Sequence, residues 1–183
     1  MSAEDKAKWD AKYASRPMKT CGPPAEWVER NLGSLPRGGR VLDLACGDGA
    51  NTLLLASRGN RVVAVDISEQ GLAIGKKIAG PLPIDWVEAD LDDYSPPANE
   101  FDLVVCIKFL DRKRIVEIVN DALKPGGLLL AETYNTRDGL SHVKNPDFLL
   151  RDGEWLMLFP SYQVLAHDES GPTSKLLARK PIA

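Results

Sequence analysis

The sequence has few residues of the kinds that build metal sites and disulfide frameworks. Its three cysteines, Cys21, Cys46 and Cys106, form no CxxC pair, and the chain has 2 histidines. The odd cysteine count and the scarcity of histidine argue against a disulfide scaffold and a zinc site. We therefore expect reduced thiols that pack as small apolar side chains, and no bound metal.

Long apolar runs and an excess of basic charge are also missing. No apolar run approaches the ~18 residues that span a bilayer, and the first residues lack the apolar segment of a signal peptide. The chain has 23 Lys and Arg against 26 Asp and Glu, a formal net charge of -3. Nucleic-acid-binding proteins usually carry a basic face. We expect a cytoplasmic monomer or homodimer with neither a nucleic-acid nor a membrane partner.

Apolar runs alternate with helical patterns along most of the 183 residues. Near-continuous apolar strands separated by helices predict an α/β fold, a Rossmann-like three-layer sandwich whose parallel sheet is covered on both faces. A hairpin, with Glu169–Pro172 as its connection, should close the sheet. Strands are expected at 40–45, 61–66, 84–89, 101–107, 128–132, 162–167 and 175–180. Helices are expected at 3–15, 24–33, 50–58, 68–78, 111–123 and 154–159, with a sharp turn at Pro125–Gly127.

The strongest motif, Val-Leu-Asp-Leu-Ala-Cys-Gly-Asp-Gly-Ala-Asn at 41–51, joins a strand to a helix. Gly47 and Gly49 permit a tight turn and close approach of the backbone to a ligand. The helix start offers free N–H groups to an anion such as a carboxylate. Asp43, just before the turn, favours an ammonium over a pyrophosphate. The loop is thus suited to a zwitterionic amino acid.

Two further acids follow the next two strands. Asp66 comes about 20 residues after the glycine turn, where a carboxylate can bind both hydroxyls of a ribose. Asp90 can accept the exocyclic amine of adenine, with Leu91 packed against the ring. Each signal alone has a structural alternative: a plain strand–helix turn at Gly47, a helix-capping acid at Asp66, an Asx turn at Asp90. Their order and spacing together favour a ligand site.

These segments, with Val-Asp-Ile-Ser at 65–68 and Leu-Lys-Pro-Gly-Gly-Leu-Leu-Leu-Ala-Glu-Thr at 123–133, resemble the class I S-adenosylmethionine-dependent methyltransferases. The start at 9–13, the stretch at 145–150 and the end at 176–180 are similar to the small tellurite-resistance-like methyltransferases. The resemblance implies seven strands, the last antiparallel. It implies S-adenosyl-L-methionine as cofactor and methyl transfer to a small molecule such as a thiol, oxyanion or small acid.

The resemblance also assigns parts of the cofactor to particular residues. It places Asp43, Ala45 and Gly47 around the methionine part, Asp66 at the ribose and Cys106 near the sulfonium. Ala45 stands where the class often has glycine, and alanine fits there if φ stays negative. The expected cofactor-binding set is Asp43, Ala45, Cys46, Gly47, Asn51, Asp66, Ile67, Ser68, Asp90, Leu91 and Cys106.

The sequence contains no convincing general base. Tyr134, Arg137 and His142 follow the fifth expected strand and are weak catalytic candidates. His142 is also compatible with an exposed loop histidine, and Arg137 and Lys144 with solvated surface charge. Trp9 and Tyr13 fit equally a lid over the cofactor or an apolar stripe on the core.

We expect a single domain over residues 1–183. Residues 1–36 would form N-terminal helices or a lid, 38–136 the cofactor-binding core, and 137–183 a substrate-side segment with the hairpin. Two other functions stay open: a cofactor-binding regulatory module without turnover, and a nicotinamide dehydrogenase. The second is disfavoured by Asp43, by Thr52 in place of a third glycine, and by the lack of a Tyr-x-x-x-Lys pattern.

Overall fold

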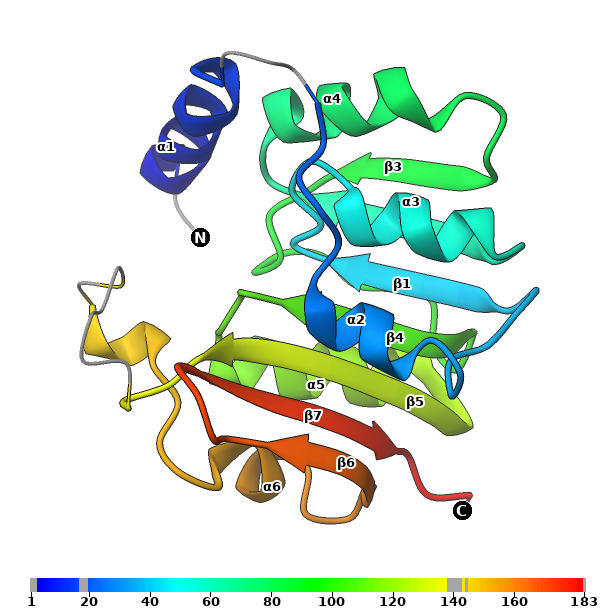
Figure 1. Ribbon diagram of the computed structural model, residues 1–183, viewed down its shortest axis with the longest axis vertical. Coiled ribbons are helices and arrows are strands. Elements are labelled where there is room, and N and C mark those ends of the chain that lie inside the picture. Colours follow the sequence, from blue (N-terminus) through cyan, green and yellow to red (C-terminus); the bar gives the residue numbers. More distant parts are fainter. Residues whose placement is uncertain (1–2, 17–19, 138–142, 144, 183) are drawn as a thin grey trace. The chain divides into compact units, whose positions relative to one another are not determined.

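The computed structural model describes residues 3–16, 20–137, 143 and 145–182. Within them, seven strands follow the order β3-β2-β1-β4-β5-β7-β6 in one sheet (Figure 1). The expected Rossmann-like α/β fold, mostly parallel with an antiparallel C-terminal hairpin, is confirmed. The chain divides into two compact units, Met1–Ser95 and Pro96–Ala183, which we describe in turn.

The first unit is built on three parallel strands whose carboxyl ends lie side by side. Leu44 pairs with Val65, and Asp66 pairs with Glu88. The loops that follow these strands therefore emerge at the same edge. The strands are β1 (Arg40–Leu44), β2 (Arg61–Asp66) and β3 (Ile84–Glu88), and the helices are α1 (Ala3–Ala14), α2 (Glu26–Asn31), α3 (Ala50–Ser57) and α4 (Glu69–Ala79).

Local sequence explains where α4 begins and ends. The side chain of Ser68 accepts a hydrogen bond from the backbone N–H of Gly71, which is the expected N-cap. Gly80, at the other end, has φ of 55° and stops the helix. Buried Leu72 and Ile74 line the inner side of α4, because the helix lies over β2 and β3.

The second unit consists of a parallel pair followed by an antiparallel hairpin. β5 runs parallel to β4 and antiparallel to β7, and β6 pairs with β7. The expected hairpin and the short helix before it are confirmed. The elements are β4 (Phe101–Ile107), α5 (Arg112–Ala122), β5 (Leu123–Tyr134), the 3-10 helix η1 (Pro146–Phe148), α6 (Glu154–Leu158), β6 (Gln163–Asp168) and β7 (Thr173–Arg179).

One expectation about this unit was wrong. Pro125–Gly127 does not form a sharp turn before the fifth strand but lies within β5, which begins directly after α5. The register against β4 shifts here, from Phe101 opposite Leu123 to Leu103 opposite Leu128. Gly126, with φ of 77°, absorbs the extra residues as a bulge while the chain stays paired. The glycines therefore mark an irregular strand and not its boundary.

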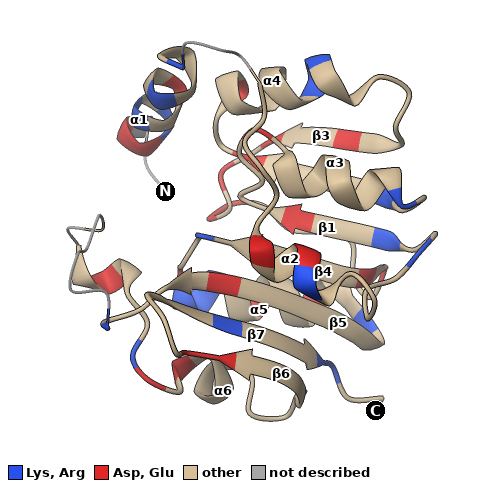
Figure 2. Cartoon of the chain, viewed as in Figure 1, with Lys and Arg blue, Asp and Glu red and all other residues tan. Residues whose placement is uncertain are grey.

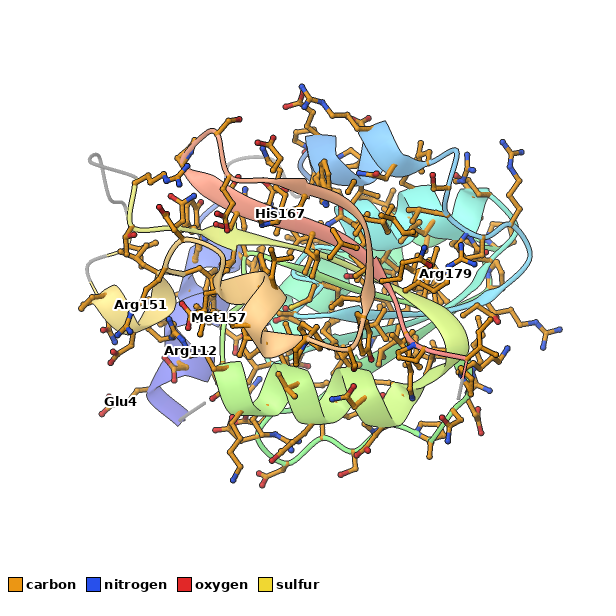
Figure 3. All side chains as sticks on the ribbon, turned by 90° about the horizontal axis from the view of Figure 1, so that it is seen from below. Glu4, Arg112, Arg151, Met157, His167 and Arg179 are labelled. Carbon is orange, nitrogen blue, oxygen red and sulfur yellow. The ribbon has the colours of Figure 1, made fainter. Side chains whose placement is uncertain are left out.

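Arg112, the first residue of α5, ties the irregular segment after β5 to the rest of the second unit (Figure 3). Its guanidinium donates to the Glu154 carboxylate at 2.5 and 3.1 Å, and to the backbone oxygens of Asp147 and Leu149 at 2.6 and 2.9 Å. The fork geometry of arginine suits this set of four acceptors. One side chain thus fixes both η1 and α6.

Charge of both signs is spread over the surface elements of each unit (Figure 2). No single-sign field stands out on the elements drawn, in keeping with the formal net charge of -3. No helix in the described parts of the chain is both long and apolar enough to cross a membrane.

Candidate functional site

The loop from Ala45 to Gly49 joins β1 to α3 in a tight, left-handed course. Ala45, Gly47 and Gly49 have φ of 53°, 60° and 81°. The negative φ under which alanine would fit at position 45 without strain is therefore not present. A Cβ in this region is crowded by the backbone and costs roughly 1–2 kcal/mol. The strain at Ala45 explains why glycine suits this position better.

The two glycines of the loop face aromatic rings of the same unit. A Cβ built on Gly47 would lie 2.2 Å from the hydroxyl oxygen of Tyr13, and one on Gly49 would lie 2.4 Å from the ring of Trp86. Such distances are far below van der Waals contact. Close packing by Tyr13 and Trp86, together with the positive φ of both residues, therefore favours glycine here, in addition to any approach by a ligand.

Asp66, at the end of β2, is held by two backbone N–H groups. One carboxylate oxygen accepts from Gly47 at 2.7 Å and the other from Ser68 at 2.8 Å. Burial raises the pKa of this carboxyl above its usual value, and these two hydrogen bonds oppose the shift. The same residue thus joins the glycine loop to the start of α4. Its expected ribose contact remains a prediction.

Asp43 lies beneath the glycine loop and is 1% exposed. One oxygen accepts a hydrogen bond from the hydroxyl of Thr52 at 2.5 Å. The pKa of Asp43 is raised to about 7, chiefly because the carboxyl is buried. The charge of Asp66 also raises this pKa, and the hydrogen bond from Thr52 opposes the shift. Thr52 is a site residue that our sequence reasoning did not include, because nothing in the pattern links positions nine residues apart. Cys46, beside them, is buried.

Three other expected residues hold the loops together. The Asn51 side chain accepts from the N–H of Ala25 at 2.8 Å, which ties α3 to the segment before α2. Ser68 is fully buried and donates its hydroxyl proton to Asp10 at 2.7 Å. The backbone oxygen of Ile67 accepts from Lys6 at 3.3 Å. These contacts stabilise the site whether or not the residues touch a ligand.

The loop after β3 contains an Asx turn, in which Asp90 accepts from the N–H of Asp92 at 2.9 Å. The structural alternative for Asp90 is thereby confirmed, and it does not exclude an adenine contact. Leu91 is fully buried. Contact of Leu91 with an adenine ring remains a prediction.

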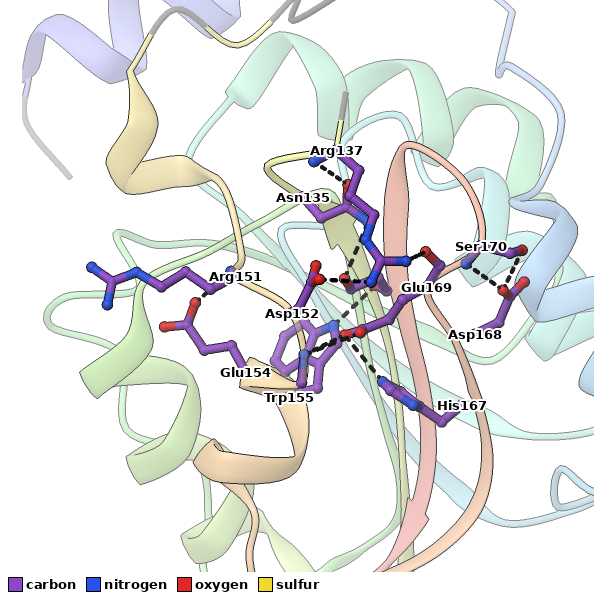
Figure 4. Close-up of polar contacts among 12 residues, drawn as sticks. Asn135, Arg137, Arg151, Asp152, Glu154, Trp155, His167, Asp168, Glu169 and Ser170 are labelled. Atoms are coloured by element: carbon purple, nitrogen blue, oxygen red, sulfur yellow. Dashed lines mark hydrogen bonds and ion pairs between the residues drawn. The ribbon is translucent and has the colours of Figure 1, made fainter. Parts of the chain in front are cut away.

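The remaining candidates belong to the second unit. Cys106 is fully buried in β4, and Tyr134 ends β5 half-buried. The Arg137 guanidinium donates to the Asp152 carboxylate at 2.7 Å and to the backbone oxygen of Glu169 at 2.6 Å (Figure 4). Asp152 raises the pKa of Arg137, and a catalytic role of Arg137 remains a prediction. His142, like Lys144, lies outside the described residues.

The other histidine, His167, forms a cluster that the sequence analysis did not consider. Its Nε2 lies 3.2 Å from the carboxylate of Glu169, which also accepts from the N–H of Gly153 at 3.0 and 3.1 Å (Figure 4). The contacts link the β6–β7 connection to the start of α6. In the described residues, no group of three or more His, Cys, Asp or Glu is arranged to hold a metal ion.

The chain matches one protein family and several known relatives over much of its length. Residues 41–127 match a family described as a methyltransferase domain. A putative methyltransferase YqeM of Bacillus subtilis is 32% identical over 62% of this chain and 50% of its own length. A ubiquinone biosynthesis O-methyltransferase of Aromatoleum aromaticum is 29% identical over 69% of this chain and 57% of its own length. The matched part of the chain thus spans about half the length of these relatives.

Solved structures share the fold. An S-adenosylmethionine-dependent methyltransferase from Mesorhizobium loti superposes with a TM-score of 0.71 at 21% identity, over 86% of this chain and 99% of that one. TehB from Haemophilus influenzae superposes with a TM-score of 0.73 at 20% identity, over 96% of this chain and 66% of that one. The matched methyltransferase family and the S-adenosylmethionine-dependent structural neighbours support the cofactor expected from the sequence, S-adenosyl-L-methionine. Residues 41–127 thus match a methyltransferase domain, and the fold is shared with solved S-adenosylmethionine-dependent methyltransferases.

Proposed function

We propose that this protein transfers the methyl group of S-adenosyl-L-methionine to a small-molecule acceptor. The observation that carries the proposal is Asp66, a carboxylate at a strand end with each oxygen held by one backbone N–H. A carboxylate offers about four acceptor positions. Asp66 therefore retains acceptor capacity beyond the hydrogen bonds from Gly47 and Ser68, as binding of a ribose hydroxyl requires.

The other residues of the first unit suit the remaining parts of the cofactor. We assign the methionine part to Asp43, Ala45, Cys46, Gly47 and Asn51, and the ribose to Asp66 with Ile67 and Ser68. Adenine falls to Asp90 and Leu91, while the place of Cys106 near the sulfonium stays an expectation from the sequence. The donor set is acidic, with Asp43 and Asp66 both buried. Buried acids favour a ligand that carries positive charge, as an ammonium and a sulfonium do.

When bound, the cofactor supplies an activated methyl group, so the protein needs mainly to bind, orient and exclude water. The acceptor is a thiol, an oxyanion or a small acid. The names of the relatives that are O-methyltransferases favour an oxygen nucleophile. None of the three cysteines forms a disulfide, which fits a reducing, cytoplasmic setting. We propose neither a nucleic acid nor a membrane as partner.

Two measurements on the full chain test the function. Titration calorimetry should show micromolar binding of adenosylmethionine or its demethylated product, and no binding of NAD. A screen of thiols, oxyanions and small acids with methyl-labelled cofactor should then yield a labelled product. Binding of NAD without adenosylmethionine would contradict the assignment. Binding of adenosylmethionine with no product from any acceptor would favour the regulatory module instead.

A further inference from the structure

Glu132 is a buried carboxylate near the carboxyl end of the sheet in the second unit. It belongs to β5, which lies between β4 and β7 (Figure 1). Its backbone pairs with Ile107, the last residue of β4, and with Lys175 of β7. In open α/β sheets, ligands bind outside the carboxyl ends of the parallel strands. Glu132 therefore lies where a ligand is expected, although our sequence reasoning did not include it among the catalytic candidates.

The negative charge of Glu132 has little compensation. The residue is 8% exposed, and one of its oxygens accepts a hydrogen bond from the Thr173 hydroxyl at 2.9 Å. Lys175, which lies opposite on β7, places its ammonium 3.2 Å from the Asp168 carboxylate instead. In the part of the chain that the structure describes, Glu132 has no ion-pair partner. A carboxylate that is buried without a cation is costly, so its presence calls for an explanation other than stability.

The backbone beside Glu132 has an unusual conformation. Lys108 directly follows β4 with φ of 60°, and its N–H donates to the backbone oxygen of Glu132 at 2.6 Å. A left-handed conformation is unfavourable for a residue that has a side chain. Such strain concentrates at functional sites, where the surrounding structure holds it in place. The conformation of Lys108 and the uncompensated charge of Glu132 thus point independently to the same end of β4 and β5.

The polar side chains on this face of β5 suit a particular kind of ligand. Tyr134 lies two residues after Glu132 and therefore on the same face of the strand, and Thr173 pairs with Tyr134. A carboxylate offers about four acceptor positions, of which Thr173 occupies one. The remaining positions favour a group that donates a hydrogen bond, such as O–H or S–H. The charge of Glu132 disfavours an oxyanion or a carboxylate, because like charges repel each other at a buried site.

We infer that Glu132 is the general base of the methyl transfer, and that the acceptor is a hydroxyl or thiol compound that arrives with its proton. The acceptor oxygen or sulfur forms its bond to the methyl carbon while the bond from that carbon to the sulfonium breaks, with its electron pair left on that sulfur. The acceptor proton passes to Glu132 and from there to water. Thr173 is a positioning residue, since its hydroxyl holds the carboxylate. The inference rests on the proposed function, because a base is needed only where a methyl group is transferred to a protonated acceptor.

The test follows transfer of label from methyl-labelled adenosylmethionine to phenol, 2-mercaptoethanol and benzoate by the full chain. The wild type should label phenol or 2-mercaptoethanol and leave benzoate unlabelled. Glu132→Gln keeps the side-chain size and the hydrogen bond from Thr173 but cannot take up a proton, so kcat/KM should fall about 100-fold, mainly through kcat. Thr173→Val should lower kcat/KM about tenfold, and Thr173→Ser, which keeps the hydroxyl, should restore it. Glu117→Gln, which changes an acid of α5 that pairs with Arg114, is the matched control and should leave kcat/KM unchanged.

Two further readouts need no turnover. Glu132→Gln removes a buried charge and should unfold at a higher urea concentration than the wild type, whereas Glu117→Gln should not. The Kd of Glu132→Gln for adenosylmethionine in calorimetry should stay within about twofold of the wild-type value, as expected for a residue that contacts the acceptor.

A Glu132→Gln chain that is less stable than the wild type, or that methylates a probe with the wild-type kcat/KM, would overturn the role of Glu132 while leaving the proposed function intact. A wild-type preference for benzoate would do the same. A wild-type chain that binds adenosylmethionine but labels none of the three probes would instead count against methyl transfer, and so overturn the proposed function itself.

Discussion

The hydroxyl oxygen of Tyr13 lies 2.2 Å from the point where a side chain on residue 47 would begin. Tyr13 belongs to α1, and Gly47 to the loop between β1 and α3. A glycine that sequence motifs associate with ligand approach is therefore required by the protein's own packing as well. A side chain at position 47 would meet the Tyr13 ring whether or not a ligand is bound.

Asp66→Asn should weaken adenosylmethionine binding by ~1–3 kcal/mol, because the amide NH2 replaces one carboxylate acceptor, faces a backbone N–H and cannot accept from a ribose hydroxyl. Calorimetry measures the change. Asp85→Asn, an exposed acid on β3, is the matched control and should bind as the wild type does. Equal affinity in a folded Asp66→Asn chain would remove Asp66 from the cofactor site.

Ala45→Gly should raise the free energy of unfolding. Ala45 has φ of 53°, and relief of ~1–2 kcal/mol of left-handed strain exceeds the ~0.5–1 kcal/mol that glycine loses in chain entropy. We expect a net gain of up to ~1 kcal/mol in urea unfolding. Ala50→Gly, at the start of α3 where glycine relieves no strain, should instead lose stability. A lower free energy of unfolding for Ala45→Gly would show that the backbone strain at Ala45 costs less than the chain entropy that glycine loses.

Asp43 should make stability depend on pH with a defined sign. Burial raises its pKa to about 7 in the folded chain, above the value of about 3.9 when unfolded. As pH rises, the unfolded chain releases this proton before the folded chain does. Protonated Asp43 therefore contributes its full stability below about pH 4, and this contribution to the free energy of unfolding is lost as the pH rises to about 7. Asp43→Asn should therefore gain stability relative to the wild type over that range, by at most about 1.4 kcal/mol per pH unit.

Urea unfolding at several pH values measures this difference. Asp85→Asn, on the exposed side of β3, should show no such trend. A difference between Asp43→Asn and the wild type that stays constant from about pH 4 to about pH 8 would contradict the raised pKa.

Gly75→Ala should destabilise the chain although alanine is the better helix former. A Cβ there would lie 2.3 Å from the Trp86 ring and 2.8 Å from the backbone oxygen of Asp48. Overpacking of this kind costs ~1–3 kcal/mol and exceeds the ~1 kcal/mol gained in α4. Gly33→Ala, with nothing within 4 Å of its Cβ, is the control. A more stable Gly75→Ala chain in thermal unfolding would show that Trp86 can shift aside freely.

Local patterns were enough to predict most elements. The apolar runs at 61–66 and 101–107 became β2 and β4 with the same bounds, and Ser68 caps α4 as expected. Such features depend on residues close in the chain. Pro125–Gly127 was misjudged because the same residues suit a turn and a bulge, and only pairing with β4 and β7 decides between them.

The sequence alone determined the α/β class, the glycine loop and the acids at the ends of β1 and β2, since alternation, spacing and residue type are all local in the chain. Only the tertiary structure decided what surrounds those acids. Thr52 beside Asp43, and Tyr13 over Gly47, come from segments brought together by packing. The positive φ of Ala45, in the loop whose Gly47 N–H donates to Asp66, is likewise a feature of the folded chain that residue type did not predict.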